Sequence, residues 1–184
     1  MSGHSRWAGI KHKKAITDAK KGQLFSKLVR EITIAVEGGG ADPSTNTRLR
    51  AAIERSRSEG LPKDNIERAI ERAGGPGDAA KLQEFLYEAI APGGIYILTE
   101  GITDNNNRTL VEVRKILTKY SVKLVPPNSL LWNFEKVWTE EGKDYRPKNP
   151  LEIPHEERGE ILPLLDELVD HPDVQEVYTN LLEE

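Results

Sequence analysis

The chain has no cysteine among its 184 residues. This absence excludes disulfide bonds, cysteine-ligated zinc, iron–sulfur clusters and a thiol nucleophile. The chain also lacks an apolar run long enough to span a membrane, and no continuous apolar segment follows its basic N-terminus as in a secretory signal. We therefore expect a cytoplasmic protein that needs no cofactor and no bound metal.

The motifs of common enzymes are missing as well. The glycine runs 38–40 and 93–94 lack a Walker lysine and a dinucleotide-binding pattern. There is no serine-centred nucleophile elbow and no nucleophile–base set. His155 precedes Glu156 and Glu157, but acidic residues at the start of a helix explain this group more simply than a metal site does. The sequence predicts no enzyme activity.

Positive charge is scarce in the chain as a whole and concentrated at its front. The formal net charge is −4, yet residues 1–30 hold eight Lys or Arg against one acid. Residues 1–73 hold 15 basic and 9 acidic side chains, and residues 74–184 hold 11 and 21. This segregation predicts two domains, at residues 1–77 and 78–184. The first would meet a polyanion, and the acidic second would bind a protein partner or position the first.

Apolar residues at helical spacing predict three helices in the first domain. They cover residues 17–37, residues 47–59 and residues 62 to about 73, and glycines follow each of them. Their apolar faces are narrow, which predicts a three-helix bundle with a thin core. That core would consist mostly of Leu24, Leu28, Ile32, Leu49, Ile53, Ile66 and Ile70.

The second domain shows strand-like and helix-like segments in alternation. Strands are expected at residues 82–89, 95–99, 130–138, 151–153 and 174–178, with residues 139–150 irregular. Helices are expected from residue 103 to 120 and from Pro154, with a kink or restart at Pro163. This order predicts a small α/β sandwich with a mixed or antiparallel sheet, and therefore an α+β chain.

The front of the chain carries the predicted binding residues. Basic and aromatic side chains alternate in residues 2–14, which suits contact with phosphates and bases, although Trp7 could instead pin this arm to the bundle. Cations also line the first two helices, where Arg57 adds to the set. The predicted nucleic-acid-binding residues are Arg6, Trp7, Lys11, Lys13, Lys14, Lys20, Lys21, Lys27, Arg30, Arg48, Arg50 and Arg55.

A polar cluster opens the helix expected after residue 103. Asn105, Asn107 and Arg108 could bind an anion beside the free backbone N–H groups of that helix. Ordinary helix capping by these residues explains the same cluster and is the more common arrangement.

Several segments together resemble the YebC/PmpR family, which also includes the mitochondrial translational activator of cytochrome c oxidase. The resemblance covers most of the chain and is densest over residues 1–110. The segments that carry it are Gly3–Lys14, Asp18–Gly22, Phe25–Ile32, Arg48–Ile53, Leu61–Ile70, Thr103–Thr109 and Asp173–Tyr178. It implies a helical N-terminal domain followed by α/β domains, and a probable transcriptional regulator that binds DNA. The family is also linked to the ribosome, so ribosomal RNA is the alternative partner.

The chain departs from the family pattern in one place. Members usually carry a further α/β domain inserted in the second one, whereas here Phe134–Val137 runs almost directly into Asp144–Asn149. This is therefore a short form. The sequence leaves open the target sequence, the regulated gene, the oligomeric state and any function that needs the inserted domain.

Overall fold

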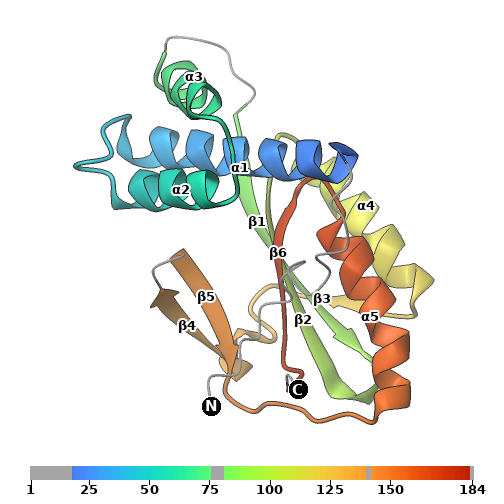
Figure 1. Cartoon of the computed structure of the whole chain (residues 1–184). Coiled ribbons are helices and arrows are strands. Elements are labelled where there is room, and N and C mark those ends of the chain that lie inside the picture. Colours follow the sequence, from blue (N-terminus) through green and yellow to red (C-terminus); the bar gives the residue numbers. More distant parts are fainter. Residues whose placement is uncertain (1–17, 76–80, 140–141, 183–184) are drawn as a thin grey trace. The chain divides into compact units, whose positions relative to one another are not determined.

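The computed structural model describes residues 18–75, 81–139 and 142–182. By their contacts they divide into two compact units (Figure 1). The helical unit holds α1 (Asp18–Gly39), α2 (Thr47–Ser58) and α3 (Lys63–Gly74). The other unit combines sheet and helix, which confirms the α+β class. The expected domain boundary after residue 77 lies outside the described residues and stays a prediction.

The helical unit is organised around its longest helix. α2 and α3 each contact α1 extensively and contact one another little. Of the predicted core, Leu28, Ile32, Leu49, Ile53 and Ile66 are buried, and two further members are partly buried beside them. The predicted helices are confirmed to within a few residues, because the apolar stripe and the glycines that follow it act together.

Asn46 joins α1 to α2. Its side-chain oxygen accepts a hydrogen bond from Leu49 N–H, which caps α2, and its amide nitrogen donates to the carbonyls of Ala35 (2.7 Å) and Gly40 (2.8 Å) at the end of α1. Asn46 is buried, and a Cβ at Gly39 would lie 2.7 Å from its amide nitrogen. The turn between the two helices is therefore fixed by one side chain that fits only against a glycine.

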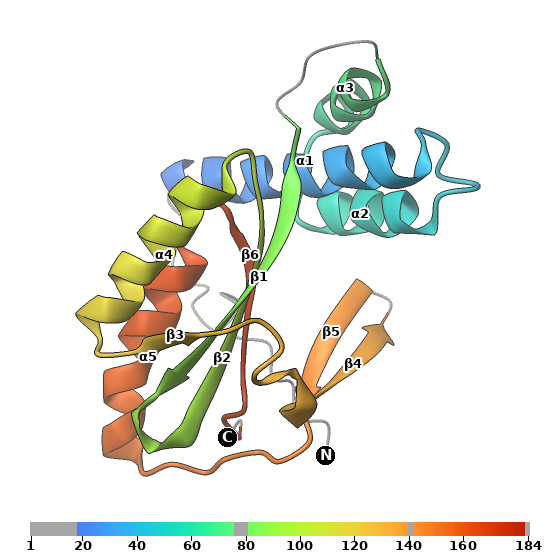
Figure 2. The same ribbon diagram turned by 180° about the vertical axis from the view of Figure 1, so that it is seen from behind.

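The second unit is built on a four-stranded sheet with the order β3-β1-β2-β6 (Figures 1 and 2). Helices α4 and α5 cover one face of this sheet. The elements are β1 (Gln83–Ala91), the 3-10 turn η1 (Pro92–Gly94), β2 (Ile95–Thr103), α4 (Asn106–Lys119), β3 (Lys123–Val125), α5 (His155–Val169) and β6 (Val174–Thr179). The pairs β1–β3 and β2–β6 are antiparallel, and the short turn η1 requires the same of β1–β2.

A bulge in β2 brings the sheet into very close contact with its neighbours. The register shifts between Glu100 and Gly101, and a Cβ at Gly101 would lie 2.1 Å from the carbonyl oxygen of Asp173 and 2.3 Å from the Phe85 ring. Only glycine fits this position, because backbone lies on one side and a buried ring on the other.

The other face of the sheet is covered by a separate two-stranded hairpin, β4 (Phe134–Thr139) and β5 (Gly142–Pro147). Phe134 and Tyr145 of the hairpin pack with Leu98 and Tyr178 of the sheet. The rings of Tyr145 and Tyr178 meet edge to face, with centroids 5.2 Å apart. The strand β5 lies where the sequence predicted an irregular segment. Its charged residues Lys143, Asp144 and Arg146 hid it, although Asp144 and Tyr145 are both buried in the structure.

Other expectations for this unit need correction. The strand β3 was not predicted, since its three residues are too few to show a period. The strand expected at residues 151–153 is a single parallel bridge between Leu151 and Leu181. Helix α5 continues through Pro163, where a restart was expected. Gly159 lies four residues before this proline, and both are exposed, so water can satisfy the carbonyl group that loses its partner.

Limited proteolysis should cut the chain between Gly74 and Lys81, where glycine and proline dominate the sequence. Two fragments should result, and mass spectrometry would identify the new termini. First cleavage elsewhere, for instance near Thr139, would show that the domain boundary is misplaced.

Replacing Asn46 with Ala should lower the free energy of unfolding by about 2 kcal/mol, since it removes a helix cap and leaves buried carbonyls unsatisfied. Urea titration followed by circular dichroism measures this loss. Ser44→Ala is the control, because Ser44 is exposed and bonds only to its neighbour Asp42. Equal stability of the two variants would contradict the role given to Asn46.

Candidate nucleic-acid interface

Five predicted binding residues belong to the N-terminal arm. Arg6, Trp7, Lys11, Lys13 and Lys14 lie outside the described residues. Their role in binding stays a prediction.

The cations of α1 lie on its solvent-facing sides. Lys20 and Lys21 are exposed, and Lys27 and Arg30 are half-buried. Lys20 and Lys27 are seven residues apart, which is two turns, so they lie on the same side of the helix. The Lys21 ammonium group lies 5.6 Å from the centre of the Phe25 ring, a cation–π contact that holds its charge close to the helix.

The four arginines of α2 form two pairs on opposite flanks of the helix. Arg48 and Arg55 are seven residues apart, as are Arg50 and Arg57, and the two pairs lie on either side of the buried stripe through Leu49 and its helical neighbours. The sequence predicted only that these cations line the helix. The structure places them in two narrow basic strips.

Arg55 and Arg50 show contacts that fix their side chains within the helical unit. Arg55 Nη1 lies 3.0 Å from Glu31 of α1, with 27% and 18% of the two side chains exposed. This ion pair ties α2 to α1 and neutralises much of the charge of Arg55. Arg50 donates at 3.3 Å to the carbonyl of Pro43 and at 3.4 Å to the hydroxyl of Thr47, so its guanidinium group lies along the loop before α2.

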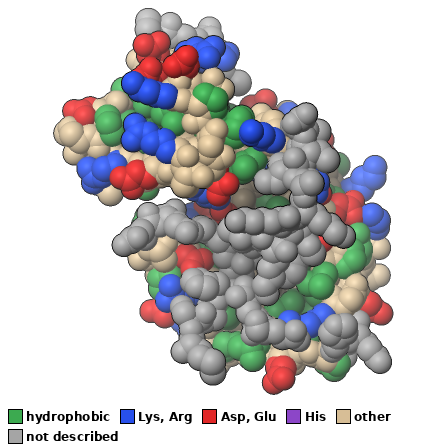
Figure 3. All heavy atoms as spheres, in the orientation of Figure 1, with side chains coloured by type: hydrophobic (Ala, Val, Ile, Leu, Met, Phe, Trp, Pro, Cys, Tyr) green, Lys and Arg blue, Asp and Glu red, His purple; other side chains and the backbone are tan. Residues whose placement is uncertain are grey.

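The helical unit is only weakly basic apart from the arm. Residues 18–75 hold 11 basic and 9 acidic side chains. Helix α3 carries three of each, the composition of an ordinary solvated face. Figure 3 shows Lys and Arg side chains over α1–α3 as separate groups, interrupted by acidic and neutral ones. Most of the positive excess of the first domain therefore belongs to residues 1–17.

The residues predicted to bind an anion are engaged in capping and ion pairing. Asn105 caps α4 by accepting a hydrogen bond from Arg108 N–H, and Asn107 is exposed. The guanidinium group of Arg108 lies 2.6 Å from Asp173 and 2.9 Å from Asp104. Its hydrogen bond with Asp173 raises the pKa of Arg108 above its ordinary value. The anion site stays a prediction, and these contacts favour the capping alternative.

Asp173 is the centre of a buried polar network that the sequence did not reveal. One carboxylate oxygen of Asp173 accepts hydrogen bonds from Thr109 (2.7 Å), Thr103 (3.1 Å) and Arg108 (2.6 Å). These donors are more than 60 residues away in the chain, so no spacing indicates them. The sequence contained one indirect indication of this network. All four residues lie in the two segments that resemble the family, Thr103–Thr109 and Asp173–Tyr178.

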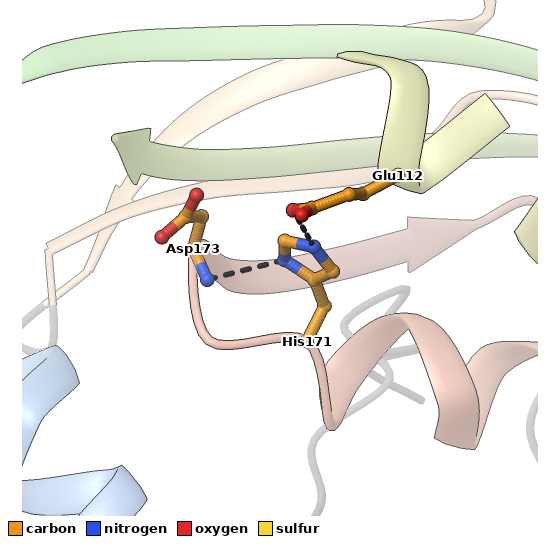
Figure 4. Close-up of side chains that lie close together, drawn as sticks. All are labelled: Glu112, His171 and Asp173. Atoms are coloured by element: carbon orange, nitrogen blue, oxygen red, sulfur yellow. Dashed lines mark hydrogen bonds and ion pairs between the residues drawn. The ribbon is translucent and has the colours of Figure 1, made fainter. Parts of the chain in front are cut away.

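Glu112, His171 and Asp173 form a group with metal-binding residue types, since one ligand atom of each lies within 4.8 Å of the others. Figure 4 shows a hydrogen bond at each ring nitrogen of His171. Nδ1 accepts from the backbone N–H of Asp173 at 3.2 Å, so Nε2 carries the proton and donates to Glu112 at 3.0 Å. In this arrangement neither nitrogen has a lone pair to offer, and the group stabilises the start of β6.

Burial raises the pKa values of three ionisable side chains of the second unit, and such perturbed groups can mark functional sites. Burial raises the pKa of Glu100, and Lys143 opposes this shift through an ion pair. Burial also raises the pKa of Tyr87 and of Tyr145. Packing of the sheet against the hairpin explains the shift of Glu100.

The raised pKa of Glu100 gives a pH dependence with a definite sign. Glu100 ionises at a lower pH in the unfolded chain than in the folded chain. Its contribution to the free energy of unfolding is therefore complete below its unfolded pKa and declines as the pH rises towards its folded pKa. In the Glu100→Gln variant this pH-dependent loss of stability is absent. The midpoint of thermal unfolding of the variant, relative to the parent, should therefore rise between about pH 4 and pH 7. A difference that falls with pH would refute this.

Three comparisons place the chain among known proteins. Residues 5–76 match the model described as the TACO1/YebC protein N-terminal domain, and residues 82–141 match the TACO1/YebC second and third domain. A probable transcriptional regulatory protein of Dictyoglomus turgidum is 52% identical over 136 residues, which cover 74% of this chain and 55% of that protein. A conserved hypothetical protein of Aquifex aeolicus is 32% identical, with a TM-score of 0.84 over 97% of this chain and 98% of that one.

The relatives also show the difference in length. The chain spans about half the length of the first relatives it matches, 55% and 54%. A probable transcriptional regulatory protein of Dictyoglomus thermophilum is 37% identical over 237 aligned positions, covering 98% of this chain and 95% of that protein. Since this chain has 184 residues, at least 53 of those positions (237 less 184) have no counterpart in it. The short form is thereby confirmed. Within the described residues, no helix is both long and apolar enough to traverse a bilayer.

Proposed function

Because the chain belongs to the TACO1/YebC family, we propose that it is a non-enzymatic regulator of gene expression that binds DNA through its basic front. Its relatives are named probable transcriptional regulatory proteins. The arm supplies most of the charge, and the strips on α1 and α2 extend the contact. The acidic second domain would position the first or bind a protein in the cytoplasm.

The observation that carries this proposal is the placement of positive charge. Fifteen of the chain's 26 basic side chains lie in residues 1–73. Lys20 and Lys27 of α1 repeat after two helical turns, about 10 Å along the axis. Cations spaced along a helix edge can contact successive phosphates of one backbone, whereas a single cluster neutralises one point.

The same arrangement supports little discrimination between sequences. The arginines of α2 lie at the two edges of its buried stripe, and the exposed side opposite that stripe carries Thr47, Glu54 and Ser58. That side would present an acid to a groove and no row of arginine or asparagine side chains to read bases. Phosphate contacts would dominate, and unrelated duplexes should differ by about tenfold or less in affinity, since no base contacts of ~1–3 kcal/mol each are formed.

Ribosomal RNA is the alternative partner. The specific observation in its favour is this lack of a helix positioned to read bases, together with a family that includes a translational activator. A backbone-directed basic surface suits structured RNA as well as duplex DNA. Binding to both polymers must therefore be measured side by side.

The test is a charge reversal with a matched control. Lys20, Lys27 and Arg48 are changed together to Glu, and the control changes Lys63, Arg68 and Arg72 on the balanced face of α3. Both triple variants alter the net charge equally. The first should lose at least tenfold in affinity for a duplex, and the second should lose much less. Circular dichroism and thermal unfolding verify that both variants are folded.

Salt dependence tests the arm in the same assay. If ~5 front-half cations each neutralise one phosphate, the logarithm of affinity should fall against the logarithm of salt with a slope of roughly −4 to −5 on duplex DNA. Changing Lys11, Lys13 and Lys14 to Gln should flatten that slope. A parent protein with no salt response would remove the proposal, and a strong preference for a ribosomal RNA fragment would make the alternative the better description.

A further inference from the structure

Trp132 is an exposed aromatic residue held in a fixed position. It lies in the 3-10 turn η2 (Leu131–Asn133), just before the hairpin, and 59% of it is exposed. Its ring meets Tyr96 edge to face, with centroids 6.2 Å apart. This contact with Tyr96 orients the indole at the surface.

The segment that leads to Trp132 is also held firmly. Glu88 is buried in β1, and its two carboxylate oxygens accept hydrogen bonds from the backbone N–H groups of Asn128 and Leu130. Figure 2 shows this segment running from β3 to the base of the hairpin. A surface fixed before binding loses less conformational entropy when a ligand arrives.

A buried polar group without a partner belongs to the residue that follows Trp132 in the chain. Asn133 is 1% exposed, and its side-chain oxygen accepts from Asn149 Nδ2 at 2.8 Å. Within the described residues its own amide nitrogen has no acceptor. A buried donor of this kind costs free energy unless an acceptor reaches it. The nitrogen is covered, so an acceptor from a ligand would reach it only if a covering group moved aside.

A cation lies beside the same residue. Lys148 is the first residue after β5. Its backbone N–H donates to the carbonyl of Asn133 at 2.7 Å, so the chain that leaves β5 lies against η2. The Lys148 side chain is exposed. The Lys148 backbone is thus tied to Asn133, and its ammonium group stands on a flexible stem at the surface.

We propose that Trp132, Asn133 and Lys148 form a second nucleic-acid site, which takes one unpaired base and its phosphate from a single strand. The base would stack on Trp132, since aromatic rings provide a platform for any base. A base oxygen would accept from Asn133 Nδ2, and the phosphate would pair with Lys148. A base in a duplex is unavailable for such stacking, so the site selects single strands. It is separate from the basic face of the helical unit and does not depend on the function proposed for that face.

Trp138 provides an internal comparison. It is still more exposed, at 76%, and Lys136 lies 5.5 Å from its ring centre. However, Glu140 follows it by two residues in the sequence, whereas no acid lies within two residues of Trp132. Exposure alone would predict binding at Trp138, whereas the proposed combination of groups predicts it at Trp132.

The experiment uses the full chain with one tryptophan at a time. Trp7→Phe with Trp138→Phe leaves Trp132 as the reporter, and Trp7→Phe with Trp132→Phe leaves Trp138. Each protein is titrated with the same short unstructured oligonucleotide, once as RNA and once as DNA. The fluorescence of Trp132 should be quenched with saturation, and that of Trp138 should change little. Quenching by one polymer alone identifies it as the source of the strand, and equal quenching shows that the site accepts both.

Two further variants test the remaining groups. Stacking is worth about 1–3 kcal/mol per base, so Trp132→Ala should weaken single-strand binding roughly fivefold to 150-fold in a protein whose thermal midpoint is unchanged. Lys148→Gln should reduce the salt slope by about 0.7. Repeating the titration in the Lys20, Lys27 and Arg48 triple variant separates this site from the helical face, since quenching of Trp132 should persist there. Absence of quenching in a folded parent, or equal quenching of Trp138, would overturn the proposal.

Discussion

The geometry of the proposed DNA-binding face depends on the side chain of Asn46. Its amide caps α2 while it also satisfies carbonyl groups at the end of α1, and both tasks require it to be buried against Gly39. The turn between these helices, which have 22 and 12 residues, is therefore fixed by the small side chain of Asn46. Without this side chain the turn between α1 and α2 would loosen, although the shared core and the Arg55–Glu31 ion pair would still hold the two helices together. The separation of their cations would then vary more.

Charge and structure divide the work between the arm and the helices. The described helical unit has two more basic than acidic side chains, with 11 against 9, and one of its arginines serves the α1–α2 contact through Glu31. Such a surface can orient a polyanion, but it provides little of the electrostatic attraction by itself. In the proposed function, the arm would supply that attraction through side chains in a short stretch of sequence. Affinity would then come mainly from the arm, and orientation from the helical strips.

Much of the fold could be predicted from the sequence, and the reasons are local. Helices α1–α3 show a clear apolar period, and glycine follows each of them. The strand β5 escaped prediction because Lys143, Asp144 and Arg146 gave it the composition of a loop, and its burial arises only when the hairpin packs on the sheet. The network around Asp173 escaped for a different reason, since its donors are more than 60 residues away and capping explained them locally. The exposed Trp132 could not be singled out either, because exposure and unsatisfied donors are properties of the folded chain.

The hairpin has a consequence for where a further domain can be inserted into this fold. Strand β4 ends at Thr139 and β5 begins at Gly142, so the chain leaves and re-enters the unit at neighbouring points. A module whose own ends lie close together can be added or removed at such a point without breaking a hydrogen bond of the main sheet. The point between β4 and β5 is therefore a permissive insertion site. The sheet and its covering helices are complete with or without an inserted domain. A fluorescent domain or a second binding module placed there should leave the buried contacts of Phe134 and Tyr145 intact.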